Sequence, residues 1–131
     1  MPEFIPEHTP HNLDAFTRGY LDAAEWLLDD ETDRSKIRGW MKEAITRAKK
    51  DCAAFQSDNA ALLDQYREAY KPKGDYDVDE CAGHDFYLTR CGHGTGFWDR
   101  GLGDLGDKLA DAARRCGEVW TDVYRGRIYF T

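Results

Sequence analysis

Residues 37–55 read IRGWMKEAITRAKKDCAAF and carry the strongest helical pattern in the chain. Apolar residues recur there every three or four positions, as on one face of an α-helix: Ile37, Trp40, Met41, Ala44, Ile45, Ala48, Cys52 and Phe55. Lysine and arginine side chains alternate with this stripe, which is typical of a solvated opposite face. We therefore predict an amphipathic helix that follows an Asp33 cap and places Trp40 in the core.

The pattern continues after Ser57-Asp58-Asn59 and ends at Pro72 and Gly74. Leu62, Leu63, Tyr66 and Ala69 supply the second part of the stripe. The segment from Asp33 to Tyr70 is therefore either one continuous helix or two helices with a turn between them.

A shorter stripe on the N-terminal side predicts another helix, from an Asn12 cap to about Leu28. Its apolar positions are Leu13, Phe16, Tyr20, Ala24 and Leu27. Residues 1–11 contain three prolines and little periodicity, so we expect them to form a flexible arm.

The C-terminal half changes to dense glycine and aromatic residues. Residues 86–90 and 95–98 have strand composition around Cys91-Gly92-His93-Gly94, which predicts a hairpin, with a helical start at 77–85 as the alternative. A further helix begins at an Asp104 cap and ends at Gly117. Two alternating runs around Arg125-Gly126 predict a closing hairpin.

This order of elements predicts an α+β fold, in which the N-terminal helices pack on a small antiparallel sheet. The expected order is helix, one or two further helices, hairpin, helix, hairpin. A chain of 131 residues is near the usual size of one domain, so we expect residues 1–131 to form a single domain.

Composition narrows the class of protein. Hydrophobic residues make up 41% of the chain, and no apolar run approaches the roughly 18 residues of a membrane span. The N-terminus has neither a basic head nor an apolar segment, so we expect a cytoplasmic protein without a membrane partner. The four cysteines lack the spacing of a disulfide scaffold, and we expect reduced thiols.

The net charge of −7 disfavours direct binding of nucleic acid, because that affinity comes from cations that neutralise phosphates. An acidic chain suits basic partners better, although such a charge also keeps an ordinary small domain soluble. The oligomeric state is not indicated.

Residues 83–100, called block 83–100 below, hold two histidines, two aspartates and two arginines among aromatics and glycines. They resemble a family of small uncharacterised proteins of bacteriophages and mobile elements that share the pattern G-H-D-F-W/Y-L-T-R-x-G-H-G-x-G-F-W-D-R. The resemblance extends more loosely over most of the chain. It implies a phage accessory protein and no particular reaction.

Block 83–100 allows a zinc site as one hypothesis. Two thiols and two imidazoles lie close together in sequence and could form a tetrahedral shell: Cys81, His84, Cys91 and His93. However, the Cys91-to-His93 step is shorter than in common metal knuckles, and the resembling family has an amide residue at the position of Cys91. We therefore predict no metal and no cofactor.

The block also allows acid–base chemistry, with one of its histidines oriented by an aspartate and an arginine holding an anion. The candidate residues are His84, Asp85, Arg90, His93, Asp99 and Arg100. The alternative is that the aspartates and arginines pair with each other across the hairpin. We favour this structural role, because no nucleophile and base stand in a recognised relation.

A glycine pattern and two tryptophans could also indicate binding. Residues 101–106 match the dinucleotide-binding pattern G-x-G-x-x-G, but only 25 residues follow Gly106, too few for the required βαβ unit. Trp26 and Trp120 lie off their apolar stripes, so each is either an exposed binding residue or a large core residue.

The expected function is therefore that of a phage accessory factor that binds a host protein, and a nucleic-acid-binding protein is one candidate for that partner. Its narrowest form is a counter-defence inhibitor similar to anti-CRISPR proteins. The alternative is a small enzyme or a ligand- or metal-binding domain that uses block 83–100.

Overall fold

The computed structural model describes residues 8–10, 12–29, 31–92 and 95–131. Its α-helices are α1 (Ala15–Trp26), α2 (Lys42–Asp58), α3 (Ala60–Ala69), α4 (Val78–Arg90) and α5 (Asp104–Arg115). Its strands are β1 (Gly39–Trp40), β2 (Thr121–Tyr124) and β3 (Arg127–Phe130), and its short 3-10 helices are η1 (Arg34–Lys36) and η2 (Phe97–Asp99). The predicted α+β class is confirmed.

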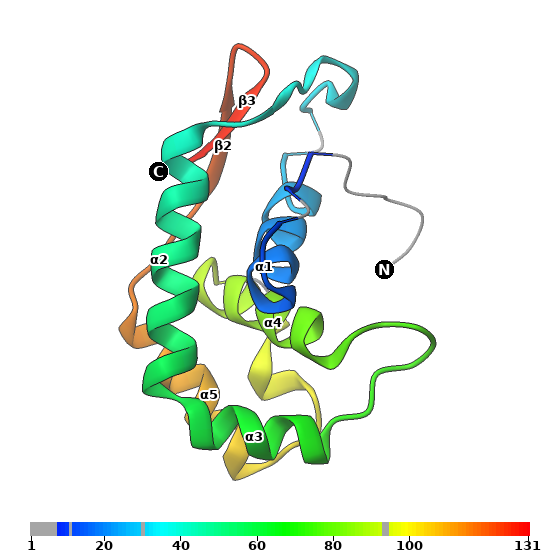
Figure 1. The fold of residues 1–131 in the computed structure, drawn as a ribbon, viewed down its shortest axis with the longest axis vertical. Helices are drawn as coiled ribbons and strands as arrows, with labels where there is room; N and C mark the ends of the chain where they lie inside the picture. Colours follow the sequence, from blue (N-terminus) through cyan, green and yellow to red (C-terminus); the bar gives the residue numbers. More distant parts are fainter. Residues whose placement is uncertain (1–7, 11, 30, 93–94) are drawn as a thin grey trace.

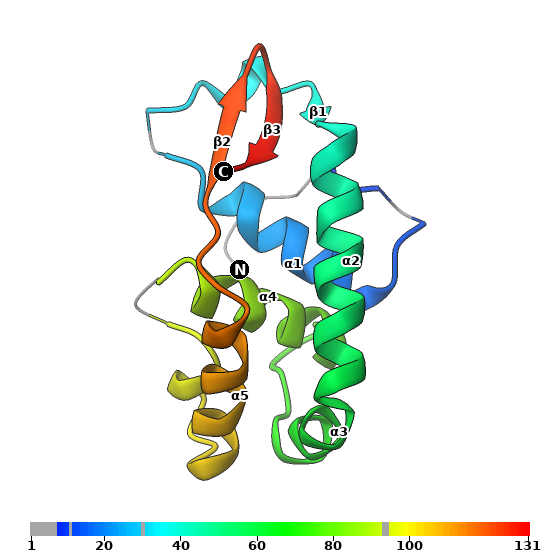
Figure 2. The ribbon, with the colours of Figure 1, turned by 90° about the vertical axis from the view of Figure 1, so that its left-hand side faces the viewer.

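The small sheet lies at one end of the molecule and helices α3 and α5 lie at the other (Figures 1 and 2). Helix α2 runs along one side between the two ends, and α1 and α4 occupy the middle. No helix in the described part of the chain is long and apolar enough to cross a membrane.

Helices α1 and α4 approach each other very closely because each has a glycine at the contact. A Cβ atom on Gly83 would collide with the backbone carbonyl of Phe16, and one on Gly19 would collide with that of Glu80. The core around this contact is aromatic. The rings of Phe55 and Phe86 stack with centroids 4.1 Å apart.

The sheet is mixed, with strand order β1-β3-β2. Strand β1 pairs in parallel with β3, and β2 pairs antiparallel with β3, so the expectation of a purely antiparallel sheet is wrong. The predicted closing hairpin is present. Arg125 and Gly126 both have positive φ, of 50° and 80°, as a two-residue turn between twisted strands requires.

The predicted hairpin in residues 86–98 is wrong, because α4 continues through Arg90. Asp77 caps this helix by accepting hydrogen bonds from the N–H groups of Asp79 and Glu80. Residues 85–90 are all buried, so other segments of the chain surround this part of the helix. Tertiary burial thus overrides the strand propensity of the aromatic residues, and the helical alternative is the one observed.

The long helical segment is two helices, separated at Asn59, where φ is −123° and ψ is 28°. Helix α2 begins at Lys42, so Ile37 and Trp40 precede it. Both are buried, and Trp40 pairs with Ile128 in the sheet. The prediction of a core Trp40 is confirmed, but its helical placement is wrong because β3 pairs with this segment.

Three predicted helix caps are displaced. Asp14 rather than Asn12 caps α1 by accepting from the N–H of Thr17. Asp33 caps η1, and α5 begins after Gly103, so Asp104 is its first residue. The cap is displaced by two residues at α1 and by one residue at α5, which is less than one helical turn. At α1, Asn12 and Asp14 are both residue types that cap helices, so the sequence pattern did not distinguish them.

Candidate functional site

The candidate residues of block 83–100 enter two separate groups of structural contacts. In the first group, the Asp85 carboxylate is 1% exposed and is held by Arg100. Nε and a terminal nitrogen of Arg100 donate to Asp85 Oδ1 at 3.0 and 2.7 Å, and the Tyr66 hydroxyl donates to Oδ2 at 2.9 Å. Burial raises the pKa of Asp85, while Arg100 and Tyr66 lower it. The carboxylate thereby links α4, α3 and the segment after η2.

The second group surrounds Arg90, which is 4% exposed at the end of α4. Its guanidinium donates to Asp51 Oδ2 at 2.9 Å, to the Tyr20 hydroxyl at 3.0 Å, and to two carbonyls at the end of α5. These carbonyls belong to Cys116 and Gly117 and lack partners inside their own helix. Arg90 therefore joins four elements through groups of the chain itself.

Of the remaining candidates, the structure describes His84 and Asp99, and within the described residues neither side chain forms a hydrogen bond or ion pair with that of Asp85 or Arg90. His84 lies on α4, where burial and then the charge of Arg100 lower its pKa to about 4, so the imidazole is neutral at physiological pH. Asp99 is exposed in η2. His93 lies outside the described residues. The expected pairing of Asp85 with Arg100 is present, although it does not cross a hairpin.

The zinc hypothesis fails in its geometry among the residues that are placed. Cys81 and Cys91 are ten residues apart along the line of α4, which separates them by about 15 Å. Within the described ranges, no three His, Cys, Asp or Glu side chains are positioned to share a metal ion. The four cysteines form no disulfide.

The glycine-rich run 101–106 follows the helical segments α4 and η2, and the described part of the chain has no strand immediately before it. Gly101 and Gly103 have φ of 71° and 59°, which glycine adopts without strain. The run is a turn that leads into α5, as expected from the sequence.

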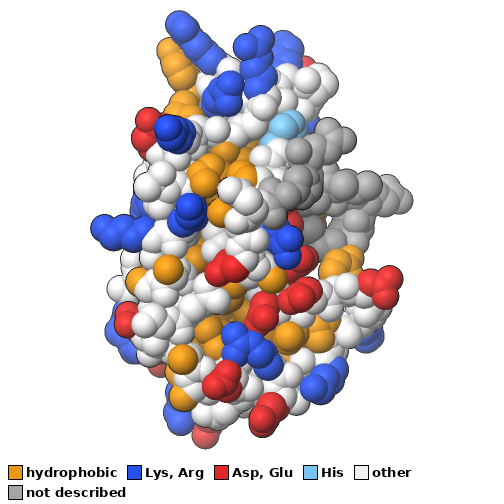
Figure 3. All heavy atoms as spheres, viewed as in Figure 1, with side chains coloured by type: hydrophobic (Ala, Val, Ile, Leu, Met, Phe, Trp, Pro, Cys, Tyr) orange, Lys and Arg blue, Asp and Glu red, His pale blue; other side chains and the backbone are white. Residues whose placement is uncertain are grey.

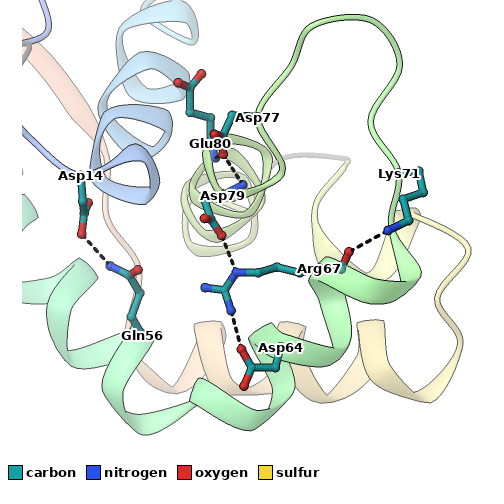
Figure 4. A network of polar contacts seen from close by, with 8 residues as sticks. All are labelled: Asp14, Gln56, Asp64, Arg67, Lys71, Asp77, Asp79 and Glu80. Atoms are coloured by element: carbon teal, nitrogen blue, oxygen red, sulfur yellow. Dashed lines mark hydrogen bonds and ion pairs between the residues drawn. The ribbon is translucent and has the colours of Figure 1, made fainter.

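Carboxylates near α1, α3 and α4 also have structural partners (Figure 4). Arg67 bridges two of them, with Nε 2.7 Å from Asp79 and a terminal nitrogen 2.7 Å from Asp64. Asp14 accepts from the Gln56 amide in addition to capping α1. These acidic side chains hold helices together, and the surface they form is not an array of unpaired carboxylates.

The closing hairpin, in contrast, presents aromatic side chains to solvent. Trp120 is 52% exposed and Tyr124 is 56% exposed. Side chains alternate across a strand, so these residues share one side of the hairpin. We call this side the outer face; it comprises Trp120, Asp122, Tyr124, Arg127 and Tyr129. Ile128 and Phe130 lie on the opposite, core side.

Of the two predicted binding tryptophans, only Trp120 is largely exposed. Trp26 ends α1, is partly buried, and its carbonyl accepts a hydrogen bond from Arg34. The sequence analysis missed Tyr124. The two-residue period could have found it, because positions 120, 122 and 124 of a strand lie on the same side.

Positive charge surrounds the turn of the hairpin. An open pocket of about 620 Å³ lies beside it, between the turn and η1. Its lining includes the side chains of Lys36, Arg38 and Arg125, which we call the basic tip. Lys and Arg side chains gather at this end of the molecule, whereas Lys, Arg, Asp and Glu side chains are mixed over the rest of the face shown (Figure 3).

Comparisons with protein-family models, with curated proteins and with solved structures find no match to this chain. The resemblance of block 83–100 to phage proteins therefore stays a prediction.

Proposed function

We propose that this chain acts by binding a partner protein and that the outer face of the closing hairpin is its contact surface. The observation that carries the proposal is the joint exposure of Trp120 and Tyr124 on one side of β2. Large aromatic side chains are enriched at the centres of protein interfaces, where they bury much area and lose few rotamers.

The edge of β2 offers a second kind of contact. Thr131 N–H donates to the Trp120 carbonyl at 2.9 Å, so Trp120, Asp122 and Tyr124 form the hydrogen-bonded pairs with β3. The backbone groups of Thr121 and Val123 consequently point away from β3. The Asp122 carboxylate accepts from the Val123 N–H and the Tyr87 hydroxyl accepts from the Thr121 N–H, so a partner strand could bind this edge only through the outward carbonyls.

The contacts of block 83–100 support binding over catalysis. Asp85 pairs with Arg100 and Arg90 pairs with Asp51 inside the protein, so these charged groups are engaged in the fold. The outer face, in contrast, exposes Trp120 and Tyr124.

The narrower form of the proposal is a phage accessory protein that acts on a host protein in the host cytoplasm, with inhibition of a defence protein as its most specific version. Support for this form comes from the resemblance of block 83–100. The hairpin surface suits an inhibitor because its strands are already ordered, so binding costs little conformational entropy.

Affinity purification with three forms of the chain tests the proposal. Trp120→Ala removes the largest aromatic of the outer face, while Trp98→Ala is the matched control, because Trp98 is 44% exposed in η2. We expect proteins captured by the wild type and by Trp98→Ala to be lost with Trp120→Ala. Equal capture by all three forms would contradict the assignment of the hairpin as the contact.

A further inference from the structure

The basic tip has a charge opposite to that of the whole chain. Lys36, Arg38 and Arg125 line one pocket, and Arg127 lies next to them on the outer face, although the net charge is −7. A small positive region on an otherwise negative molecule favours a partner whose negative charge is confined to a small area.

Among the described residues, carboxylates do little to neutralise the cations of the basic tip. Arg38, Arg125 and Arg127 form no ion pair with any carboxylate of the described residues. Lys36 has only a long contact of 4.0 Å with Asp33, in which both side chains are exposed. The guanidinium of Arg125 lies over the Tyr124 ring, 5.2 Å from its centroid, which joins the basic tip to the aromatic outer face.

The backbone that carries these cations is held in place. Arg38 N–H donates to the Gly126 carbonyl and connects the η1 segment to the hairpin turn at 2.6 Å. Arg34 donates to three carbonyls at the end of α1, those of Glu25, Trp26 and Leu28. The loop and the turn are thus fixed relative to the core, so a ligand loses little energy in ordering them.

We propose that the outer face and the basic tip together bind an acidic segment of the partner protein. Apolar side chains of that segment pack on Trp120 and Tyr124, and its aspartate or glutamate carboxylates lie beside Arg38, Arg125 and Lys36. This inference rests on the proposed function and specifies the chemistry of the partner.

A polypeptide fits this surface better than a nucleic acid does. The basic tip supplies only a few cations and the whole chain carries a net charge of −7, so a phosphate backbone that extended past the tip would meet net repulsion. A short acidic segment needs only the tip.

Selection from an unbiased library of displayed random peptides of about 12 residues tests the inference. The wild-type chain is compared with the double variant Arg38→Glu/Arg125→Glu. The matched control is Lys49→Glu/Lys50→Glu, which makes the same charge change on an exposed face of α2. Circular dichroism and thermal melting establish that each variant is folded.

We expect peptides enriched on the wild type to contain more Asp and Glu than Lys and Arg. Their affinity should fall about tenfold or more in the Arg38→Glu/Arg125→Glu variant and with added salt, and should change less than about twofold in the control. Enriched peptides that are neutral or basic, or that bind both double variants equally, would overturn the inference.

The two proposals fail differently in this experiment. If the enriched peptides depend on Trp120 but are not acidic, the acidic-partner inference fails and the hairpin contact stands. If no enriched peptide loses affinity in Trp120→Ala, or none is enriched, both fail. A labelled thymidine oligonucleotide of about 15 residues is measured in parallel, and tighter binding of it at the basic tip would assign the surface to nucleic acid instead.

Discussion

Block 83–100 and the closing hairpin differ in how they use the same residue types. The block combines histidine, aspartate and arginine with aromatic side chains, yet Asp85, Phe86 and Arg90 are buried. The hairpin has fewer such residues, but Trp120 and Tyr124 remain exposed. The comparison teaches that a cluster of chemically capable residues in a sequence indicates a site only if the fold leaves those residues accessible.

The position of each region explains the difference. Helix α4 lies in the middle of the molecule, so polar residues on it must find partners inside the protein (Figure 2). The hairpin lies at one end, with only one of its faces against the core. Four predictions test this contrast, beginning with the largest expected effect.

Replacing Asp85 by alanine should destabilise the protein by about 3–5 kcal/mol, because a buried ion pair loses one partner. Arg100 and the Tyr66 hydroxyl would both lose their acceptor. Urea unfolding measures the change, and Asp99→Ala, at an exposed position, should stay within about 0.5 kcal/mol of the wild type. A stable Asp85→Ala variant would indicate that the carboxylate is kept for activity.

Gly83→Ala should destabilise the protein by about 2 kcal/mol, although alanine favours a helix by about 1 kcal/mol in isolation. The added methyl group would force α4 away from the Phe16 carbonyl of α1. Gly117→Ala is a useful comparison, since no atom lies within 4 Å of its Cβ position and only the positive φ of 89° opposes it. Chemical unfolding of both variants separates crowding from backbone strain. A Gly83→Ala variant as stable as the wild type, or more stable, would show that the α1–α4 contact has room for a methyl group.

His84 should make the protein acid-sensitive. Its pKa is about 4 in the folded state and 6.5 in the reference state, so the unfolded chain binds its proton first as pH falls. The contribution of neutral His84 to the free energy of unfolding is fully present above about pH 6.5. It decreases as the pH falls toward 4, by about 2 kcal/mol after allowance for the partial exposure of the side chain.

The pH effect is measured by urea unfolding of the wild type and of His84→Gln at pH values near 7 and 4.5. The variant should lose less stability on acidification than the wild type. Parallel profiles in the two proteins would mean that His84 titrates normally and is accessible to solvent.

Trp120→Ala should have the smallest effect on stability, within about 0.5 kcal/mol, because the side chain is half exposed. The same variant should lose partner binding, so binding and stability separate at this position. A loss of more than about 2 kcal/mol in thermal or chemical unfolding would show that Trp120 serves the fold and would weaken the contrast with block 83–100.

Part of the candidate site could be predicted. The choice of Trp120 came from its place beside an alternating run, and the Asp85–Arg100 pair was among the expected structural pairs. The pairing of Arg90 with Asp51 could not be foreseen, because 39 residues separate them in the sequence. Nor could the basic tip, which brings together the η1 segment and a turn almost 90 residues later.

By itself, the sequence determined the elements whose signals are local. These include the amphipathic stripes of α1, α2 and α5, the stop at Gly117 and the two-residue turn at Arg125-Gly126, because helical periodicity and positive φ depend on neighbouring residues. The tertiary structure alone decided that 78–90 is a helix, that Gly39–Trp40 joins β3, and which aromatic rings face solvent. Strand and helix propensities differ by only about 1 kcal/mol per residue, whereas burial of a large side chain contributes more, so packing between distant segments decides these cases.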